Sequence, residues 1–417
     1  MERFIVIVIK MLLFSIDGVV FTLLRYPLIM IVFYESCSAM LLRTFVLLCS
    51  LSFATSSFSE NKGHPFVVKE TASLSAPWAM EFLPSGKILV SEMSGKLKLL
   101  DENGAVLNDI AGVPEVVFEG QGGFGDIKLH PRFEQNQLLY FSYAEKGTED
   151  LAGATVARAK LTIEGNSGSL NQIEVIWRQI KTNGRGHYGH RITFGPDGYL
   201  WISSGDMQKF NPAQDMQSNL GKIIRLNDDG SLPTDNPFPS SNPVTSEIWS
   251  LGHRNPLGLS FDKTGRLWEV EMGPWGGDEL NLVRRGANYG YPIVSNGDHY
   301  TRDPIPDHDT RHDFYPPEIT WTPVISPSSM IFYEGDEFKE WKGNALIGSL
   351  SAKGVVRVKF NGDRAEEIER FEMETRIRAI GESADGAIWL LEDGRPIRKE
   401  KSYAQGGGRL LRLTAVK

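Results

Sequence analysis

Four short segments of the chain combine glycines with histidine, arginine, glutamine or acidic side chains, at residues 119–126, 184–191, 250–256 and 271–279. Histidine titrates near neutral pH and is therefore suited to take up and release a proton. Arginine suits an anionic ligand, because its planar guanidinium donates two parallel hydrogen bonds to a carboxylate. Cations with few carboxylates near them in the sequence are Arg254, Arg376, Arg378 and Lys353. The segments predict a site in which histidine meets a bound anion, if the fold brings them together.

The common catalytic motifs do not describe these segments. The chain has no phosphate-binding glycine loop followed by Lys-Ser/Thr and no Gly-x-Ser-x-Gly elbow. His187 and His190 are three residues apart, but no cysteine or third histidine completes a zinc set with them. A single histidine is more often structural than catalytic, and His130, in Leu-His-Pro, fits that interpretation.

The elements that would position these segments follow from a repeated pattern. Two apolar runs flank a turn with Pro, Asp or Gly, often followed by an acidic residue, which is typical of a β-hairpin. Six copies occur, at residues 79–92, 126–143, 191–206, 257–271, 330–349 and 378–392. A four-stranded propeller blade needs about 40–50 residues, so the wider spacings leave room for loop insertions.

We therefore predict an all-β fold, a six-bladed β-propeller of four-stranded antiparallel blades with loop insertions, as one domain over residues 65–417. The 42 glycines and 22 prolines favour turns and short strands. Loops on one face of a propeller converge at its central channel, where the polar segments would meet. An irregular pair of β-sandwiches is the alternative.

Residues 1–58 form a leader that differs from the rest of the chain. Arg43 gives a short basic region after Met40, residues 44–53 are apolar, and small residues follow, as in a secretory signal peptide. We predict a signal peptide at residues 40–57, with the upstream segment absent from the mature protein. The alternative is an N-terminal membrane anchor, but the apolar run at residues 19–34 is short for a span and contains Arg25.

The leader and the net charge indicate where the protein acts and which partners are unlikely. Both cysteines, Cys37 and Cys49, lie in the leader, so the mature protein would contain no disulfide. A signal peptide predicts a periplasmic or secreted protein. The net charge of −8 and the lack of a strongly basic run argue against a nucleic-acid partner.

The polar motifs, read in order, resemble those of the soluble glucose and aldose sugar dehydrogenases that depend on pyrroloquinoline quinone (PQQ). The resemblance covers about residues 66–415. The motifs that carry it are Gly-Gln-Gly-Gly, His-x-x-x-Arg-Ile-x-Phe-x-Pro-Asp-Gly, Gly-His-Arg-Asn-Pro, Gly-Pro-x-Gly-Gly-Asp-Glu-Leu-Asn, Asn-Tyr-Gly-Tyr-Pro and Arg-Ile-Arg.

The resemblance implies roles for individual residues. His187 matches the general base that takes the proton of the sugar's anomeric hydroxyl, and Asp206 matches the carboxylate that orients it. Arg254 matches the residue that stabilises negative charge on the quinone oxygen. The remaining matches are cofactor contacts, namely Gln121, Asn255, Arg376 and Arg378.

The resemblance also implies calcium as a second cofactor. Gly273 and Pro274 match the family's cofactor-calcium site through their carbonyl oxygens, which suit this hard cation. Glu279 and Tyr289 match positions around a second, structural calcium. A loop-capping role for Asp278 and Glu279 is the alternative.

Three positions depart from the family pattern. The lysine that usually follows the fifth hairpin is missing at Ser351, and the nearest one, Lys353, would have to reach the cofactor from a shifted loop. Leu257 replaces a glutamine that is frequent in the family, and His190 replaces the usual glycine or serine. These differences bear on cofactor affinity and sugar preference more than on reaction type.

The resemblance implies an oxidoreductase that uses PQQ and calcium to oxidise the anomeric carbon of aldoses to lactones. Its partners would be an aldose sugar, an external electron acceptor and a transient contact with a membrane or redox protein. Two alternatives remain: a calcium-dependent lactone hydrolase and a non-catalytic six-bladed propeller that binds a partner. The hydrolase would need several side-chain carboxylates around its calcium, and the binding module would not need His187, Asp206 and Arg254.

Overall fold

The computed structural model describes residues 12–16, 19–23, 63–394 and 407–416 of the chain. It divides into two compact units, Met1–Glu60 and Asn61–Lys417, each considered by itself. In the first, β1 (Leu12–Ile16) pairs antiparallel with β2 (Val19–Leu23). The predicted signal peptide at residues 40–57 and both cysteines lie outside the described residues. Within the described ranges, no helix has the length and apolarity that crossing a membrane requires.

The second unit is built almost entirely from antiparallel β-sheets. Its largest sheet has the order β4 (Pro77–Phe82), β5 (Ile88–Glu92), β6 (Lys96–Leu100), β7 (Val106–Ala111), β11 (Ser167–Arg178), β10 (Ala152–Glu164), β9 (Leu138–Lys146) and β8 (Phe124–Leu129). The next two sheets are β12 (Gly189–Phe194), β13 (Leu200–Ser204), β14 (Lys222–Leu226) and β15 (Ile248–Leu251), then β16 (Pro256–Phe261), β17 (Leu267–Glu271), β19 (Asp278–Leu282) and β21 (Ile319–Trp321).

Two more four-stranded sheets and a few short elements complete the unit. These sheets are β22 (Pro327–Phe332), β23 (Ala345–Ser349), β24 (Gly354–Asn361) and β25 (Arg364–Glu372), then β26 (Ile377–Glu382), β27 (Ile388–Glu392), β28 (Gly407–Ala415) and β3 (Phe66–Ser75). The short elements are the strand pair β18 (Trp275–Gly276) and β20 (Gly297–Asp298), the helices α3 (Phe133–Asn136) and α4 (Pro243–Glu247), and the 3-10 turns η1 (Asn211–Gln214), η2 (His308–Thr310) and η3 (Lys339–Trp341).

The all-β prediction is confirmed, but one sheet differs from the predicted pattern of separate four-stranded sheets. Two four-stranded antiparallel runs, β4–β7 and β8–β11, are joined into one eight-stranded sheet. The junction is a short parallel pairing of β11 with β7, through Gly168 with Ile110 and Ser169 with Ala111. Strands β10 and β11, with 13 and 12 residues, are longer than their neighbours, and β11 therefore reaches the outer strand β7.

All six predicted hairpins are present and share one geometry. They are the antiparallel pairs β4–β5, β8–β9, β12–β13, β16–β17, β22–β23 and β26–β27, each with a register shift near the start of its first strand. A β-bulge of this kind bends a strand and increases its twist. The six first strands contact one another in sequence, and β26 contacts β4, so they form a closed ring.

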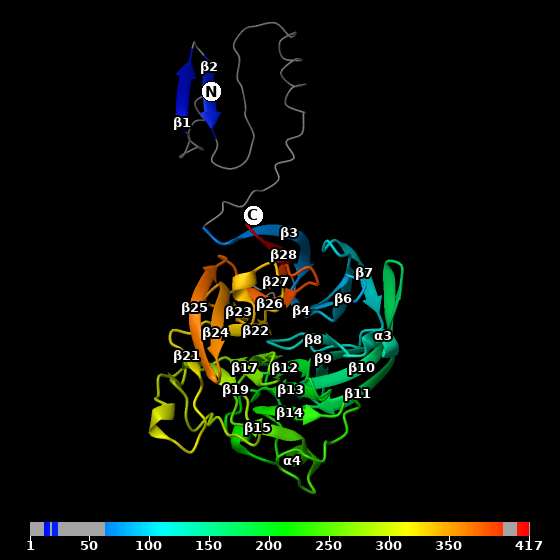
Figure 1. Ribbon diagram of the computed structural model, residues 1–417, viewed down its shortest axis with the longest axis vertical. Helices are drawn as coiled ribbons and strands as arrows, with labels where there is room; N and C mark the ends of the chain where they lie inside the picture. The colour runs from blue at the N-terminus through cyan, green and yellow to red at the C-terminus, as the bar shows by residue number, and fades with distance from the viewer. Residues whose placement is uncertain (1–11, 17–18, 24–62, 395–406, 417) are drawn as a thin grey trace. The chain divides into compact units, whose positions relative to one another are not determined.

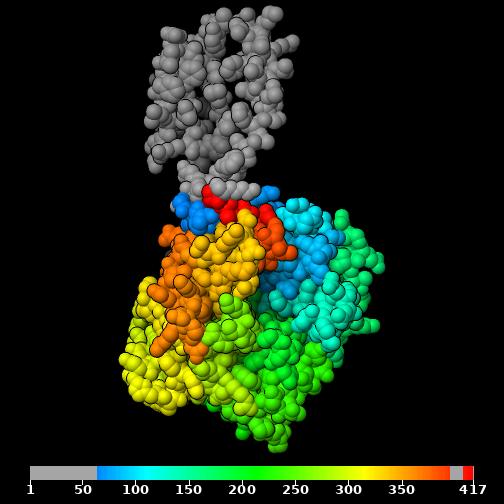
Figure 2. Space-filling view, in the orientation of Figure 1, coloured from blue at the N-terminus to red at the C-terminus, as the bar shows by residue number. Residues whose placement is uncertain are grey.

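The ring is closed by pairing between the two ends of this unit. Strand β3 is the outer strand of the last sheet and pairs antiparallel with β28, from Phe66 opposite Ala415 to Ser75 opposite Gly407. Figure 1 shows β3, β28 and β27 side by side, and in Figure 2 the colours pass around this unit from blue through green and yellow to orange and red.

The apolar core lies between neighbouring sheets. The second strands β5, β13, β17, β23 and β27 are buried at all five positions, because sheets cover both of their faces. In one such layer, Trp268 and Val270 of β17 pack with Met330 and Ile347 of β22 and β23. Full burial of both faces explains why most positions of these strands are apolar in sequence.

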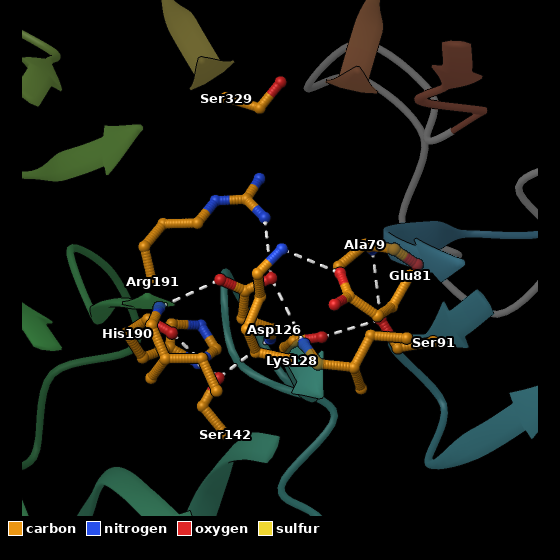
Figure 3. Close-up of polar contacts among 12 residues, drawn as sticks. Ala79, Glu81, Ser91, Asp126, Lys128, Ser142, His190, Arg191 and Ser329 are labelled. Carbon is orange, nitrogen blue, oxygen red and sulfur yellow. Dashed lines mark hydrogen bonds and ion pairs between the residues drawn. The ribbon is translucent and has the colours of Figure 1, made fainter. Parts of the chain in front are cut away.

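Arg191 of β12 links the first strands at the centre of the ring. Its Nε donates to the carbonyl of Leu257 (2.6 Å), its Nη2 to that of Ser328 (2.6 Å), and its Nη1 to Oδ1 of Asp126 (3.1 Å). The guanidinium lies 3.9 Å from the ring centre of Trp78. Figure 3 shows Arg191 extending over Asp126, and the side chain thus contacts strands of four other hairpins.

We expect Arg191→Met to lower the free energy of unfolding by about 3–5 kcal/mol, because it removes the cationic partner of the buried Asp126 carboxylate and a donor to two carbonyls. Chemical denaturation of the folded protein measures this change. The matched control is Lys128→Met, since the Lys128 side chain is 41% exposed in its ion pair with Glu81. That pair should contribute only about 0–1 kcal/mol. Equal losses in the two variants would contradict a central structural role for Arg191.

Candidate functional site

The predicted base and its carboxylate are in direct contact. His187 lies two residues before β12 and Asp206 two residues after β13, and these ends are adjacent because the two strands are antiparallel. The Nδ1 of His187 is 2.6 Å from Oδ1 of Asp206, and both side chains are buried. A carboxylate only accepts hydrogen bonds, so Nδ1 carries the proton and Nε2 keeps its lone pair for another donor.

The backbone around this pair is constrained. His187 has φ = 57°, and its N–H donates to Oε1 of Gln121 (2.8 Å). Met207 and Gln208, which follow Asp206, also have positive φ values. Such conformations cost free energy and often occur at functional sites. Gly205 makes the close approach possible, because a Cβ at this position would lie 2.0 Å from the carbonyl oxygen of His187.

The electrostatic surroundings keep His187 neutral. Burial and the nearby guanidinium of Arg254 lower the pKa of His187 below its ordinary value, while Asp206 acts in the opposite direction. A neutral imidazole can accept a proton at pH 7, which a general base requires.

Arg254 and Asn255 lie beside this pair on the segment between β15 and β16. The N–H of Asp206 donates to the carbonyl of Arg254 (2.8 Å), which connects the two segments. The Glu271 carboxylate accepts the N–H groups of Arg254 (2.5 Å) and Asn255 (3.1 Å). Glu271 ends β17 opposite Pro256 of β16, and strand pairing therefore places it under these two amides.

The Arg254 guanidinium is buried, and only some of its N–H groups donate hydrogen bonds. Nη1 donates to the carbonyl of Met272 (2.8 Å) and Nη2 to the hydroxyl of Tyr300 (3.3 Å). Among the described residues, neither Nε of Arg254 nor Oδ1 of Asn255 has a hydrogen-bond partner. Buried polar atoms without partners are uncommon in folded proteins and favour a bound ligand here.

A cavity of about 450 Å³ adjoins this site. Its lining includes Gln121, Asn255, Arg376 and Arg378 from the predicted set. His187 and Arg254 do not line it, but each is next in sequence to a lining residue, and Asp206 accepts the N–H of the lining residue Gln208 (3.0 Å). The two arginines flank the start of β26, and both donate to Oδ2 of Asp393, Arg376 at 3.1 Å and Arg378 at 2.6 Å. Guanidiniums in a cavity wall suit an anionic ligand, because each carries several N–H donors.

The same arrangement recurs in four of the hairpins. An acidic residue at or just after the end of the second strand binds a polar segment at the start of the first strand. The four cases are Glu92 with Ser75, Asp206 with His187, Glu271 with Arg254 and Asn255, and Asp393 with Arg376 and Arg378. The sequence pattern of an acidic residue after the second apolar run is therefore a positioning signal.

The carbonyls predicted to bind calcium are available. No described group donates a hydrogen bond to the carbonyl of Gly273 or of Pro274. Asp278 accepts the N–H of Gly273 (2.8 Å) and the N–H of Ser326 (2.6 Å). Asp278 therefore has the loop-capping role that was considered for it, and it fixes the segment that carries these carbonyls.

Three further predicted residues do not line the cavity. Lys353 is exposed at the turn between β23 and β24 and does not line the cavity. Glu279 is buried beside Asn281 (3.1 Å) and His308 (3.4 Å). The hydroxyl of Tyr289 donates to the carbonyl of Leu282 (2.5 Å) and accepts from the N–H of Arg284, so only other atoms of Tyr289 remain for a cation.

A buried group behind Arg254 was missed by sequence reasoning. His253, Glu269 and Glu271 place one ligand atom each within 4.8 Å of one another. Burial opposes the charge on His253, but hydrogen bonds to the two carboxylates outweigh it and raise the pKa of His253 to about 9. The missed signal was the pair of glutamates at alternate positions of β17, which point to the same face of a strand. The group supports the Glu271 carboxylate that holds Arg254 and Asn255.

Comparison with known proteins gives a consistent result. The family model for glucose / sorbosone dehydrogenase matches residues 74–399. The aldose sugar dehydrogenase YliI of Escherichia coli is 34% identical over 327 residues, which are 77% of this chain and 88% of that protein. The quinoprotein glucose dehydrogenase B of Acinetobacter calcoaceticus is 27% identical, over 85% of this chain and 91% of its own.

Comparison with a solved structure gives the same result. The PQQ-bound form of the aldose sugar dehydrogenase from Streptomyces coelicolor superposes with a TM-score of 0.69 at 27% identity. The alignment covers 84% of this chain and 98% of that one.

Proposed function

Because the chain belongs to the glucose/sorbosone dehydrogenase family, we propose that it is a PQQ- and calcium-dependent dehydrogenase that oxidises the anomeric carbon of aldoses to lactones. The observation that carries this proposal is the contact of His187 with Asp206 beside the buried guanidinium of Arg254. We further propose that the closed ring of six hairpins is a six-bladed propeller, the eight-stranded sheet counting as two blades joined at their outer edge.

The residues that line the cavity fit PQQ. The cofactor is a flat, anionic ring system with several carboxylates, and Arg376 and Arg378 supply the guanidiniums that bind such groups. The unpartnered Oδ1 of Asn255 and Nε of Arg254 offer an acceptor and a donor at the same site. When bound, PQQ supplies the quinone that accepts the electron pair from the sugar, and calcium polarises that quinone as a Lewis acid.

The calcium ligands from this chain would be the carbonyls of Gly273 and Pro274. Both residues are buried, and their carbonyls are not used by the described protein groups. The pair alone cannot complete the six to eight oxygen ligands that calcium takes, so the remaining ligands must come from the cofactor and water. Glu279 and Tyr289 remain proposed neighbours of a second calcium.

His187 and Arg254 would have different roles in this reaction. The Nε2 of His187 would accept the proton of the sugar's anomeric hydroxyl, and Asp206 would hold the ring and stabilise the imidazolium that forms. Arg254 would stabilise negative charge at the reacting centre, because its guanidinium is fixed in place before the reaction. Gln121 fixes the backbone of His187 and also faces the cavity.

The two alternatives lack such support. A calcium-dependent lactone hydrolase needs several side-chain carboxylates at its calcium, whereas the side chains named above on the cavity wall are amides and guanidiniums. A binding module would not require the His187–Asp206 pair next to Arg254. The domain at residues 65–417, the leader at residues 1–58 and a periplasmic or secreted location complete the proposal.

Reconstitution tests the proposal. We expect the purified apo-protein to oxidise aldoses in a dye-linked assay only after PQQ and calcium are both added, with the lactone as product. Removal of calcium by a chelator should abolish the activity and readdition should restore it. The controls are PQQ alone and calcium alone. A protein that binds no PQQ in calorimetric titration would refute the proposal.

A further inference from the structure

His190 lies in the cavity wall, and the mechanism above gives it no role. It lies on β12 and lines the cavity, yet only 2% of it is exposed. The imidazole packs against the ring of Trp78, with ring centres 4.9 Å apart. A Cβ at Gly125 would lie 2.2 Å from Cε1 and 2.3 Å from Nδ1 of this ring, so the imidazole fits only because residue 125 is glycine.

The hydrogen bonds around Ser142 determine which ring nitrogen carries the proton. The Ser142 hydroxyl accepts the N–H of Asp126 (2.8 Å) and donates its own proton to the carbonyl of His190 (2.8 Å). The same oxygen is 3.1 Å from Nδ1 of His190. Figure 3 shows the side chains of Ser142 and His190 next to each other. A hydroxyl has one proton, and this one is in use, so Nδ1–H must be the donor to Ser142.

This arrangement makes Nε2 a hydrogen-bond acceptor. No described residue bonds to Nε2, and the Nδ1–Cε1 edge of the ring faces Gly125 and Ser142. The ring is also neutral, because burial and the guanidiniums of Arg191 and Arg378 lower its pKa to about 3. In a wall whose other side chains include the donors Arg376 and Arg378, Nε2 is an acceptor that cannot become a cation at neutral pH.

We propose that Nε2 of His190 accepts a hydrogen bond from the pyrrole N–H of bound PQQ and thereby selects the orientation of the cofactor in the cavity. This inference rests on the proposed function. The arginines can bind carboxylates at several places on the anion, whereas the single ring N–H distinguishes one end of the molecule. A sugar hydroxyl is a donor of the same kind, but the low exposure of His190 favours the ligand that enters first and lies deeper.

Two substitutions distinguish the roles of Nδ1 and Nε2 of His190. His190→Asn can keep the bond to Ser142 through its amide but removes the acceptor at Nε2, whereas His190→Gln can place an amide oxygen near the position of Nε2. Calorimetric titration with PQQ in the presence of calcium should give a Kd raised about 3- to 10-fold in His190→Asn, as expected for one hydrogen bond. In His190→Gln it should stay within about 2-fold of the wild type.

Nitrogen NMR of the histidines supplies a second readout that packing alone would not move. The Nε2 resonance of His190 should shift when PQQ is added and should not shift further when sugar is added. An unchanged Kd in His190→Asn, equal weakening in both variants, or an Nε2 resonance that responds only to sugar would overturn the inference. Failure of the wild type to bind PQQ would instead refute the proposed function.

Discussion

His187→Ala should reduce kcat by about 10²- to 10⁴-fold while the Kd for PQQ changes little, because the variant loses the base but keeps the arginines and Asn255 that face the cavity. The measurement is steady-state oxidation of an aldose after reconstitution, together with a calorimetric titration of PQQ. Full activity in this variant would exclude His187 as the base. A large rise in Kd would instead mean that the residue mainly builds the cofactor site.

The pH dependence gives an independent check on the same residue. Burial and Arg254 lower the pKa of His187, so its neutral, active form persists somewhat below the ordinary value of 6.5. The acid limb of kcat/KM should therefore lie below pH 6.5 in the wild type. Asp206→Asn removes the group that raises this pKa, so the limb should move further to acid while the plateau falls. A limb that moves to higher pH would contradict this assignment.

Arg254→Met should reduce kcat by about 10²- to 10³-fold, the range found when one fixed donor is removed from a site of developing charge. Arg254 is 4% exposed, so its interaction with a charged group is weakly screened by water. The backbone of this segment should stay in place, because the contacts with Glu271 and Asp206 use main-chain atoms of residue 254.

Arg254→Lys is the matched control for charge. It keeps a cation without the planar fork that bonds Met272 and Tyr300, and its kcat should lie between those of Arg254→Met and the wild type. Thermal unfolding of each variant, measured without cofactor, separates loss of function from loss of fold. A kcat for Arg254→Met equal to that of the wild type would remove the electrostatic role.

Local patterns in the sequence determined the hairpins and the segments that carry the chemistry. Apolar runs around a Gly-containing turn predict a hairpin because strand pairing and turn geometry depend on neighbouring residues. The contact of His187 with Asp206 follows from the same local rule, since both lie at the adjacent ends of one strand pair. The repeated acidic residue after the second strand was visible too, although its function as a positioning group was not.

Only the tertiary structure decided which separate segments meet. The pairing of β11 with β7 and the contacts of Arg191 with the first strands of four other hairpins depend on how whole sheets pack. The exposure of Lys353 and the packing of the His190 ring against Gly125 also depend on the tertiary structure. Packing distances between sheets arise from the sum of many apolar contacts, and no short stretch of sequence encodes that sum.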